Sequence, residues 1–216
     1  MIKFLVCFVF FLVIFANNSF ANDFNAPSAG EINDAVEKIT PTRFLPGDFL
    51  YFTITVKESV SSFFKPSSLD KANFEFVLTS KRLKEVYLLY NKGDYKNSEN
   101  SVFRYKNSIK KTVRQIDKAQ AQNQDTKVLA DKIANDLVYQ DRLILFLLTS
   151  ERKLKNEQEL VSSFSELVDK IESIKPGNID RYKVTESKKI EPPEKSPEPT
   201  EKQTSNPVYN PKRIIY

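Results

Sequence analysis

The sequence predicts an all-α protein: a bundle of about four to five antiparallel helices with heptad-like packing, followed by a disordered, proline-rich C-terminal tail. Three observations support this fold class. Apolar residues recur at steps of three and four through most of residues 48–174, the period of amphipathic helices. Beyond residue 40, prolines and glycines fall between these periodic segments rather than inside them. Seven of the eleven prolines lie at or after Pro176, where the bundle is expected to give way to the tail.

Residues 1–21 are typical of a signal peptide. A basic residue, Lys3, precedes an apolar run over 4–16, and small residues at Ser19 and Ala21 predict cleavage after Ala21. The run is shorter than the roughly 20 residues that a membrane-spanning helix needs. We therefore expect export to the periplasm, the cell surface or the medium, with no transmembrane span in the mature chain. An uncleaved N-terminal anchor is the alternative.

Residues 22–40 form a polar leader with one short helix over 31–39, and the bundle is expected over 41–175. Its first long helix should run from Asp48, as N-cap, to Phe64. The β-branched residues 53–56 favour a strand locally, but a helical period sustained over 17 residues outweighs them. The apolar row of this helix consists of Phe49, Phe52, Val56, Val60 and Phe63.

A second helix is expected over 67–91, with Ser67 and Asp70 as its cap and Gly93 as its terminator. Its core-facing residues at helical spacing are Leu69, Ala72, Phe76, Leu83, Val86 and Tyr90. Charged residues of the same helix are expected to point mostly outward: Lys81, Arg82, Lys84 and Glu85.

The third helix, over 94–120, carries a basic face formed by Lys106, Lys110, Lys111 and Arg114. A solvated surface is the favoured interpretation of this face; an anionic ligand or a lipid surface is the alternative. A fourth helix begins at 125 or 126, and its apolar segment 143–148 is expected to be the most buried part of the bundle. A fifth helix is expected over 157–174, capped by Asn156, although helices four and five could also be continuous.

Residues 176–216 are charged, rich in proline and poor in apolar residues, so disorder with polyproline II character is expected. The end of this tail differs in composition. A docking peptide and a featureless end are both open for its last five residues, Lys212, Arg213, Ile214, Ile215 and Tyr216.

Composition limits the chemistry of the chain. Its single cysteine, Cys7, lies in the expected signal peptide, and the sequence has no histidine and no tryptophan. Thiol nucleophiles, imidazole bases and thiolate or imidazole metal sites are therefore excluded after cleavage. We expect no cofactor, no metal and no enzymatic activity. The 33 basic and 28 acidic residues are interspersed and form no basic stripe, so no nucleic-acid partner is expected.

Several short motifs in the first half of the expected bundle follow a recognisable pattern. They are Leu45-Pro46-Gly47-Asp48, Tyr51, Lys57-Glu58, Val60, Phe63-Phe64, Asp70-Lys71-Ala72, Arg82-Leu83 and Lys92-Gly93-Asp94-Tyr95. With these motifs the chain resembles the DUF5667 domain family, which occurs in exported bacterial proteins of unknown function. The resemblance covers about residues 41–174 and implies an extracytoplasmic helical domain without established catalytic residues. The chain departs from the family pattern in two places, the segment 53–55 and Asn73.

These observations favour an exported, non-enzymatic helical module of the cell envelope, with an interaction or structural role and a protein or envelope polymer as its partner. One alternative is an extracytoplasmic sensor or regulator that binds a receptor or an anti-sigma-type partner. A carboxylate-dependent hydrolase of envelope polysaccharide is less favoured, because the acidic residues lie beside Lys and Arg on the expected helix surfaces.

Overall fold

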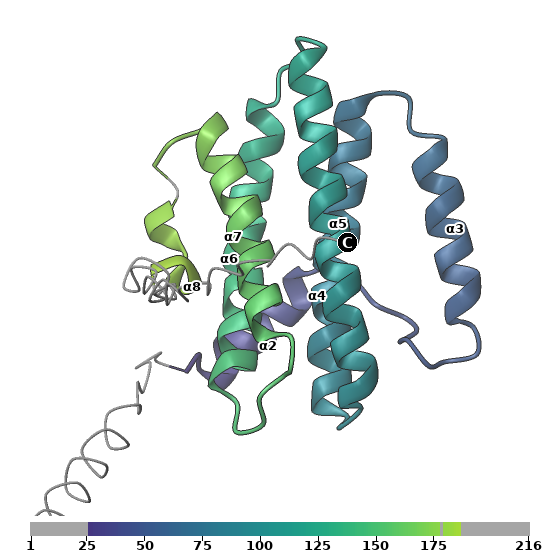
Figure 1. Ribbon diagram of the computed structural model, residues 1–216, viewed down its shortest axis with the longest axis vertical. Helices are drawn as coiled ribbons and strands as arrows, with labels where there is room; N and C mark the ends of the chain where they lie inside the picture. The colour runs from purple at the N-terminus through teal and green to yellow at the C-terminus, as the bar shows by residue number, and fades with distance from the viewer. Residues whose placement is uncertain (1–25, 178, 187–216) are drawn as a thin grey trace, which may run out of the picture.

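The computed structural model describes residues 26–177 and 179–186, and over these residues the protein is all-helical, without strands (Figure 1). The expected fold class is confirmed, and residues 53–56 are helical. The expected signal peptide and the last 30 residues lie outside the described ranges. The elements are α2 (Ala29–Lys38), α3 (Tyr51–Phe63), α4 (Ser68–Asn91), α5 (Tyr95–Ala121), α6 (Lys127–Thr149), α7 (Glu157–Ile174), a 3₁₀ turn (Ile179–Arg181) and α8 (Lys183–Glu186).

Helices α4 and α5 form an antiparallel hairpin closed by a tight turn at Gly93. This glycine has a φ of 78°, a left-handed conformation that side chains with a Cβ disfavour. Asp94 then caps α5, because its carboxylate accepts a hydrogen bond from the Asn97 backbone N–H at 3.2 Å. The expected turn and cap are both confirmed.

Two other expected caps have different outcomes. The Ser67 hydroxyl accepts from the Asp70 N–H at 3.0 Å and caps α4 as expected. Asp48 is not the N-cap of α3, which begins at Tyr51 after Leu50. The Asp48 carboxylate instead accepts from the Leu45 N–H at 2.7 Å and shapes the turn before the helix.

The apolar core lies among α4, α5, α6 and α7, with α2 packed against α6. Leu143, Ile144 and Leu147 of α6 are fully buried, as expected for the apolar segment 143–148. Helices α6 and α7 are separate, because residues 150–156 form a non-helical connection between them. All the expected helices therefore contribute residues to this core except α3.

The short helix of the leader belongs to the core. Ile32 and Ala35 of α2 and Ile39 just after it are buried in the same cluster as the bundle. The end of α2 is capped from α4, since the Lys84 ammonium donates to the Val36 carbonyl at 2.6 Å and to the Ile39 carbonyl at 3.3 Å. Burial lowers the pKa of Lys84. The expected outward orientation of Lys84 is therefore wrong.

The fold extends beyond the boundary expected at residue 175. Tyr182 is buried, its ring meets Phe164 edge to face at 5.9 Å, and its hydroxyl donates to the Ala134 carbonyl at 2.9 Å. Val184 is also fully buried, and its N–H donates to the Asp141 carboxylate at 2.9 Å. The part of the tail up to residue 186 thus covers α6 and α7.

Candidate functional site

Helix α3 lies at the edge of the bundle beside α4 (Figure 1). Hydrogen bonds and an ion pair to α4 show that its polar side faces inward. We call Tyr51, Thr55, Glu58 and Ser62 the inner row, since Tyr51, Glu58 and Ser62 bind side chains of α4 and Thr55 lines the space beneath α3. The steps of four, three and four place these residues on one side of the helix. The apolar residues of α3 fall on a different side. The helix therefore directs its polar side to the bundle and its apolar side to solvent, the reverse of an ordinary surface helix.

A buried charged network on α4 explains this orientation. Arg82 and Lys81 of α4 both form ion pairs with Glu58 of α3. Arg82 also donates to Glu85 at 2.7 Å and to the Tyr51 hydroxyl at 2.7 Å. These α4 side chains are buried, so the expectation that Lys81, Arg82 and Glu85 point outward is wrong. Charges on this side of α4 need polar partners, and the inner row supplies them.

Burial and pairing shift the acidity of this network. Burial raises the pKa of Tyr51, and the neighbouring Glu85 carboxylate raises it further. Burial also raises the pKa of Glu85, against the opposing influence of Arg82. Burial by itself would lower the pKa of Arg82, but Glu85, Tyr51 and Glu58 together raise it. The guanidinium therefore remains charged and ties α3 to α4.

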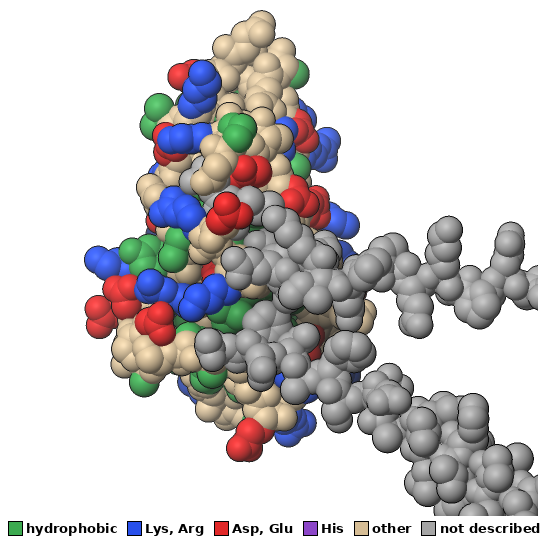
Figure 2. Space-filling view, turned by 90° about the vertical axis from the view of Figure 1, so that its left-hand side faces the viewer, with side chains coloured by type: hydrophobic (Ala, Val, Ile, Leu, Met, Phe, Trp, Pro, Cys, Tyr) green, Lys and Arg blue, Asp and Glu red, His purple; other side chains and the backbone are tan. Residues whose placement is uncertain are grey.

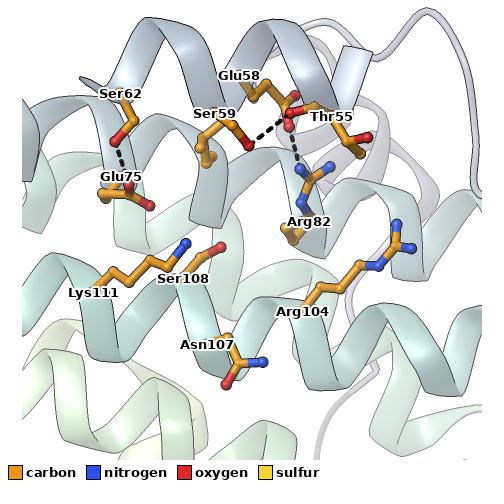
Figure 3. A pocket seen from close by; sticks show the side chains of 11 residues that line it. Thr55, Glu58, Ser59, Ser62, Glu75, Arg82, Arg104, Asn107, Ser108 and Lys111 are labelled. Atoms are coloured by element: carbon orange, nitrogen blue, oxygen red, sulfur yellow. Dashed lines mark hydrogen bonds and ion pairs between the residues drawn. The ribbon is translucent and has the colours of Figure 1, made fainter. Parts of the chain in front are cut away.

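A polar cavity of about 600 Å³ lies between α3 and the α4–α5 hairpin (Figure 3). Helix α5 contributes Arg104, Asn107, Ser108 and Lys111 at steps of three, one and three, which places them on one side of the helix. The other lining residues are Thr55, Glu58, Ser59, Ser62, Glu75, Leu78 and Arg82.

Two buried atoms on this cavity have no hydrogen-bond partner within the described residues. One is Oε2 of Glu75, a residue with only 5% of its surface exposed, whose other carboxylate oxygen accepts from Ser62 at 2.9 Å. The other is Nη1 of Arg104, whose guanidinium lies 4.9 Å from the Tyr51 ring centre. The cavity thus offers a carboxylate acceptor and a guanidinium donor to water or to a small polar molecule.

The apolar side of α3 is the second distinctive surface. We call Phe49, Phe52, Val56, Val60 and Phe63 the outer row. The exposed fractions are 95% for Phe49, 71% for Phe52 and 79% for Phe63, and Val56 and Val60 are about half exposed. Phe64 follows at 74% and contacts Phe63 edge to face at 5.4 Å. Monomeric proteins rarely leave such a contiguous apolar surface uncovered.

The structure separates the residues of the expected basic face. Lys106 pairs with Glu159 of α7 at 3.5 Å. Lys110, Lys111 and Arg114 are all exposed, and Lys111 also lines the mouth of the cavity beneath α3. The five terminal residues from Lys212 to Tyr216 lie outside the described residues. On the side of the molecule away from α3, positive and negative side chains are interspersed (Figure 2).

Within the described ranges, no group of three acidic side chains is arranged to hold a metal ion. None of the described helices is long and apolar enough to cross a membrane. The distinctive features of the described chain are therefore the polar cavity and the exposed apolar row, which lie on two sides of the same helix.

The fold and these two surfaces define a small helical domain with one reversed amphipathic helix. Residues 43–137 match the family model described as "Domain of unknown function (DUF5667)", which confirms the expected family for this part of the chain. The matched range contains α3, α4, α5, the cavity and the outer row. No curated protein and no solved structure matches the chain significantly.

Sequence reasoning missed the cavity, although its signal was present. Polar residues recur at helical spacing on three consecutive helices: Thr55, Glu58 and Ser62; Glu75, Arg82 and Glu85; Arg104, Ser108 and Lys111. Each row taken alone resembles a solvated face. Polar rows on three helices that follow one another in the chain predict a polar interface among those helices.

Proposed function

We propose that this protein is an exported, non-enzymatic interaction module of the bacterial cell envelope, and that it binds a protein partner through the outer row of α3. One observation carries the proposal: the outer row directs three phenylalanines and two valines away from the bundle. Aromatic side chains on an exposed, uncharged surface are the typical centre of a protein–protein interface. Export rests on the signal-peptide pattern of residues 1–21.

The contacts of α3 support a role in presenting this surface. The ion pairs of Glu58 and the hydrogen bonds of Tyr51 and Ser62 fix the rotation of the helix about its axis. A helix held in this way keeps the outer row directed outward instead of turning it toward the core. Presentation on a rigid element limits the entropy that ordering would cost on binding.

An extracytoplasmic sensor or regulator is the alternative, and it would use the same surface toward a receptor or an anti-sigma-type partner. The identity of the bound protein distinguishes the interaction module from the sensor or regulator.

The carboxylate-dependent hydrolase has less support. Glu58 and Glu75 both line the cavity, but the two carboxylate oxygens of Glu58 already bind Lys81 and Arg82. That pair lacks the second free carboxylate that glycoside hydrolysis needs.

The test is site-specific photocrosslinking in the producing cell. A photoreactive residue replaces Phe52 on the outer row or, as control, Val128, which is 75% exposed on α6. We expect crosslinked products from position 52 and none above background from position 128. The double variant Phe52→Ser/Phe63→Ser should lose a product formed from position 56. Equal products from positions 52 and 128, or none from position 52, would refute the proposal.

A further inference from the structure

We propose that the partner covering the outer row is a second copy of this chain, with the two α3 helices packed antiparallel across a two-fold axis at Val56. This inference rests on the proposed function, because it assigns that docking surface to one occupant. It is carried by the spacing, the charge and the size of the outer row.

The outer row is symmetric about its own midpoint. Phe49 and Phe63 lie seven residues before and after Val56, and Phe52 and Val60 lie four residues before and after it. In an antiparallel pair related by a two-fold axis, a residue before the axis meets the residue equally far after it on the other copy. Within the helix, Phe52 then meets Val60 and Val56 meets itself. Phe49 belongs to the turn before α3, so it lies beside the end of the other helix that carries Phe63. A parallel pair or an unrelated partner would not require this symmetry.

Charge is compatible with the same arrangement. The outer row contains no ionisable residue. Of the two charged residues of α3, Glu58 is turned inward to Lys81 and Arg82, and Lys57 is exposed one position after Val56. Asp48 and Lys65 lie in the segments that flank α3, eight residues before and nine after Val56, so the antiparallel pair places an acidic segment of one copy beside a basic segment of the other at both ends. A parallel pair would bring each of these residues near the same residue of the other copy. Antiparallel helices also oppose their dipoles favourably.

The surface is large enough for a stable dimer. The outer row and Phe64 together expose four phenylalanines and two half-exposed valines. At the lower value of about 150 Å² for each Phe, with a smaller contribution from the valines, they offer roughly 600–700 Å² on each copy. The pair would bury about 1,200–1,400 Å², which lies at the lower end of stable interfaces. Because α3 lies at the edge of the bundle, a second copy can approach without disturbing the inner-row contacts (Figure 1).

The first measurement is the mass in solution of the mature chain, Asn22 to Tyr216, by light scattering over a range of concentrations. We expect a dimer that dissociates on dilution. Phe52→Ser/Phe63→Ser should weaken association at least about 30-fold, because central aromatic residues dominate interface energies. Phe103→Ser, which changes an exposed phenylalanine on α5, is the matched control and should leave the dimer intact. Helical circular dichroism should be the same in all three proteins.

The second measurement determines the geometry by disulfide crosslinking. The mature chain has no cysteine, so each introduced thiol is the only one. Val56→Cys should form a covalent dimer under mild oxidation, because the two copies meet at the axis. Phe52→Cys alone should not, since its two thiols would be about 12 Å apart along the helices. A mixture of Phe52→Cys and Val60→Cys proteins should crosslink.

Three outcomes overturn the inference. They are a monomeric wild-type chain at all concentrations, a Phe52→Ser/Phe63→Ser variant that dimerises like the wild type, and Phe52→Cys crosslinking as readily as Val56→Cys. If the purified chain is monomeric while position 52 still crosslinks to another protein in the cell, self-association fails and the proposed interaction function stands. If position 52 crosslinks to nothing, both fail together.

Discussion

Glu58 of α3 and Arg82 of α4, 24 residues apart in the chain, form an ion pair that decides which side of α3 faces solvent. The same carboxylate also binds Lys81. A carboxylate enclosed with two cations is strongly tied to its position, since separating them would leave buried charges unpaired. The outer row is exposed because the inner row, on another side of α3, is bound to the charged side chains of α4.

Replacing Glu58 should loosen α3 selectively. Glu58→Ala leaves Arg82 and Lys81 without this partner, and loss of one member of a buried pair costs about 3 kcal/mol at the lower end of the usual range. We expect hydrogen-exchange protection over residues 51–63 to fall by about 100-fold. Protection in α6 should change little. Lys57→Ala, at the exposed neighbouring position, is the control and should leave α3 protected. Equal loss of protection in α3 and α6 would contradict local attachment.

Core packing should depend on α6. Ile133 is fully buried in the main apolar cluster, so Ile133→Ala should lower the free energy of unfolding by about 2–5 kcal/mol. Val128, about one and a half turns earlier on the same helix, is 75% exposed. Val128→Ala should change stability by no more than about 0.5 kcal/mol. Urea titration monitored by circular dichroism measures both, and similar values for the two variants would contradict burial of Ile133 in the core.

Two glycines provide a matched test of backbone conformation. Gly30 lies inside α2 with open space where an alanine Cβ would lie, so Gly30→Ala should raise the free energy of unfolding by about 0.5–1 kcal/mol. Gly93 has equally open surroundings but a φ of 78°. Gly93→Ala should therefore lower stability by about 1 kcal/mol. Changes of the same sign in thermal denaturation would show that one of the two conformations is wrong.

Stability at high pH should depend on Tyr182. Burial raises the pKa of Tyr182 from 10.0 to about 12. Because the folded protein holds this proton more tightly than the unfolded chain, the stabilisation is complete below pH 10 and is lost as pH rises through about 12. The urea-unfolding free energy of the wild type should therefore fall more between about pH 9 and pH 11 than that of Tyr182→Phe. Parallel decreases would show that Tyr182 is not enclosed.

The helices could be predicted from the sequence because their apolar periods are long and their caps are local. Ser67, Gly93 and Asp94 each act through residues within a few positions, so a single chain segment carries the signal. Tyr182 and Val184 could not be placed in this way. Tyr182 lies between a 3₁₀ turn and α8, and Val184 lies in that four-residue helix. These elements are too short to show a period, and the burial of both residues depends on α6 and α7.

The orientation of α3 could not be predicted from its own amphipathicity. An apolar row normally faces a core, and nothing within residues 51–63 indicates that the adjacent side of α4 is charged. That information lies in Glu75, Arg82 and Glu85, which the apolar pattern of α4 assigns to solvent. Orientation is a property of the pair of helices, whereas periodicity is a property of each one.

Because polar contacts attach α3 to the bundle, detachment of this helix should depend on urea differently from unfolding of the core. Detaching α3 from α4 would uncover ion pairs and hydroxyl groups, but little apolar surface beyond the Tyr51 ring. The denaturant dependence of a transition scales with the surface that it exposes, so this opening should be nearly insensitive to urea. Salt should weaken the attachment little, because the ion pairs of Glu58 are largely buried and buried pairs are screened much less than exposed ones. Urea would thus unfold the core of this small domain while leaving the attachment of α3 to be released by loss of its charged partners.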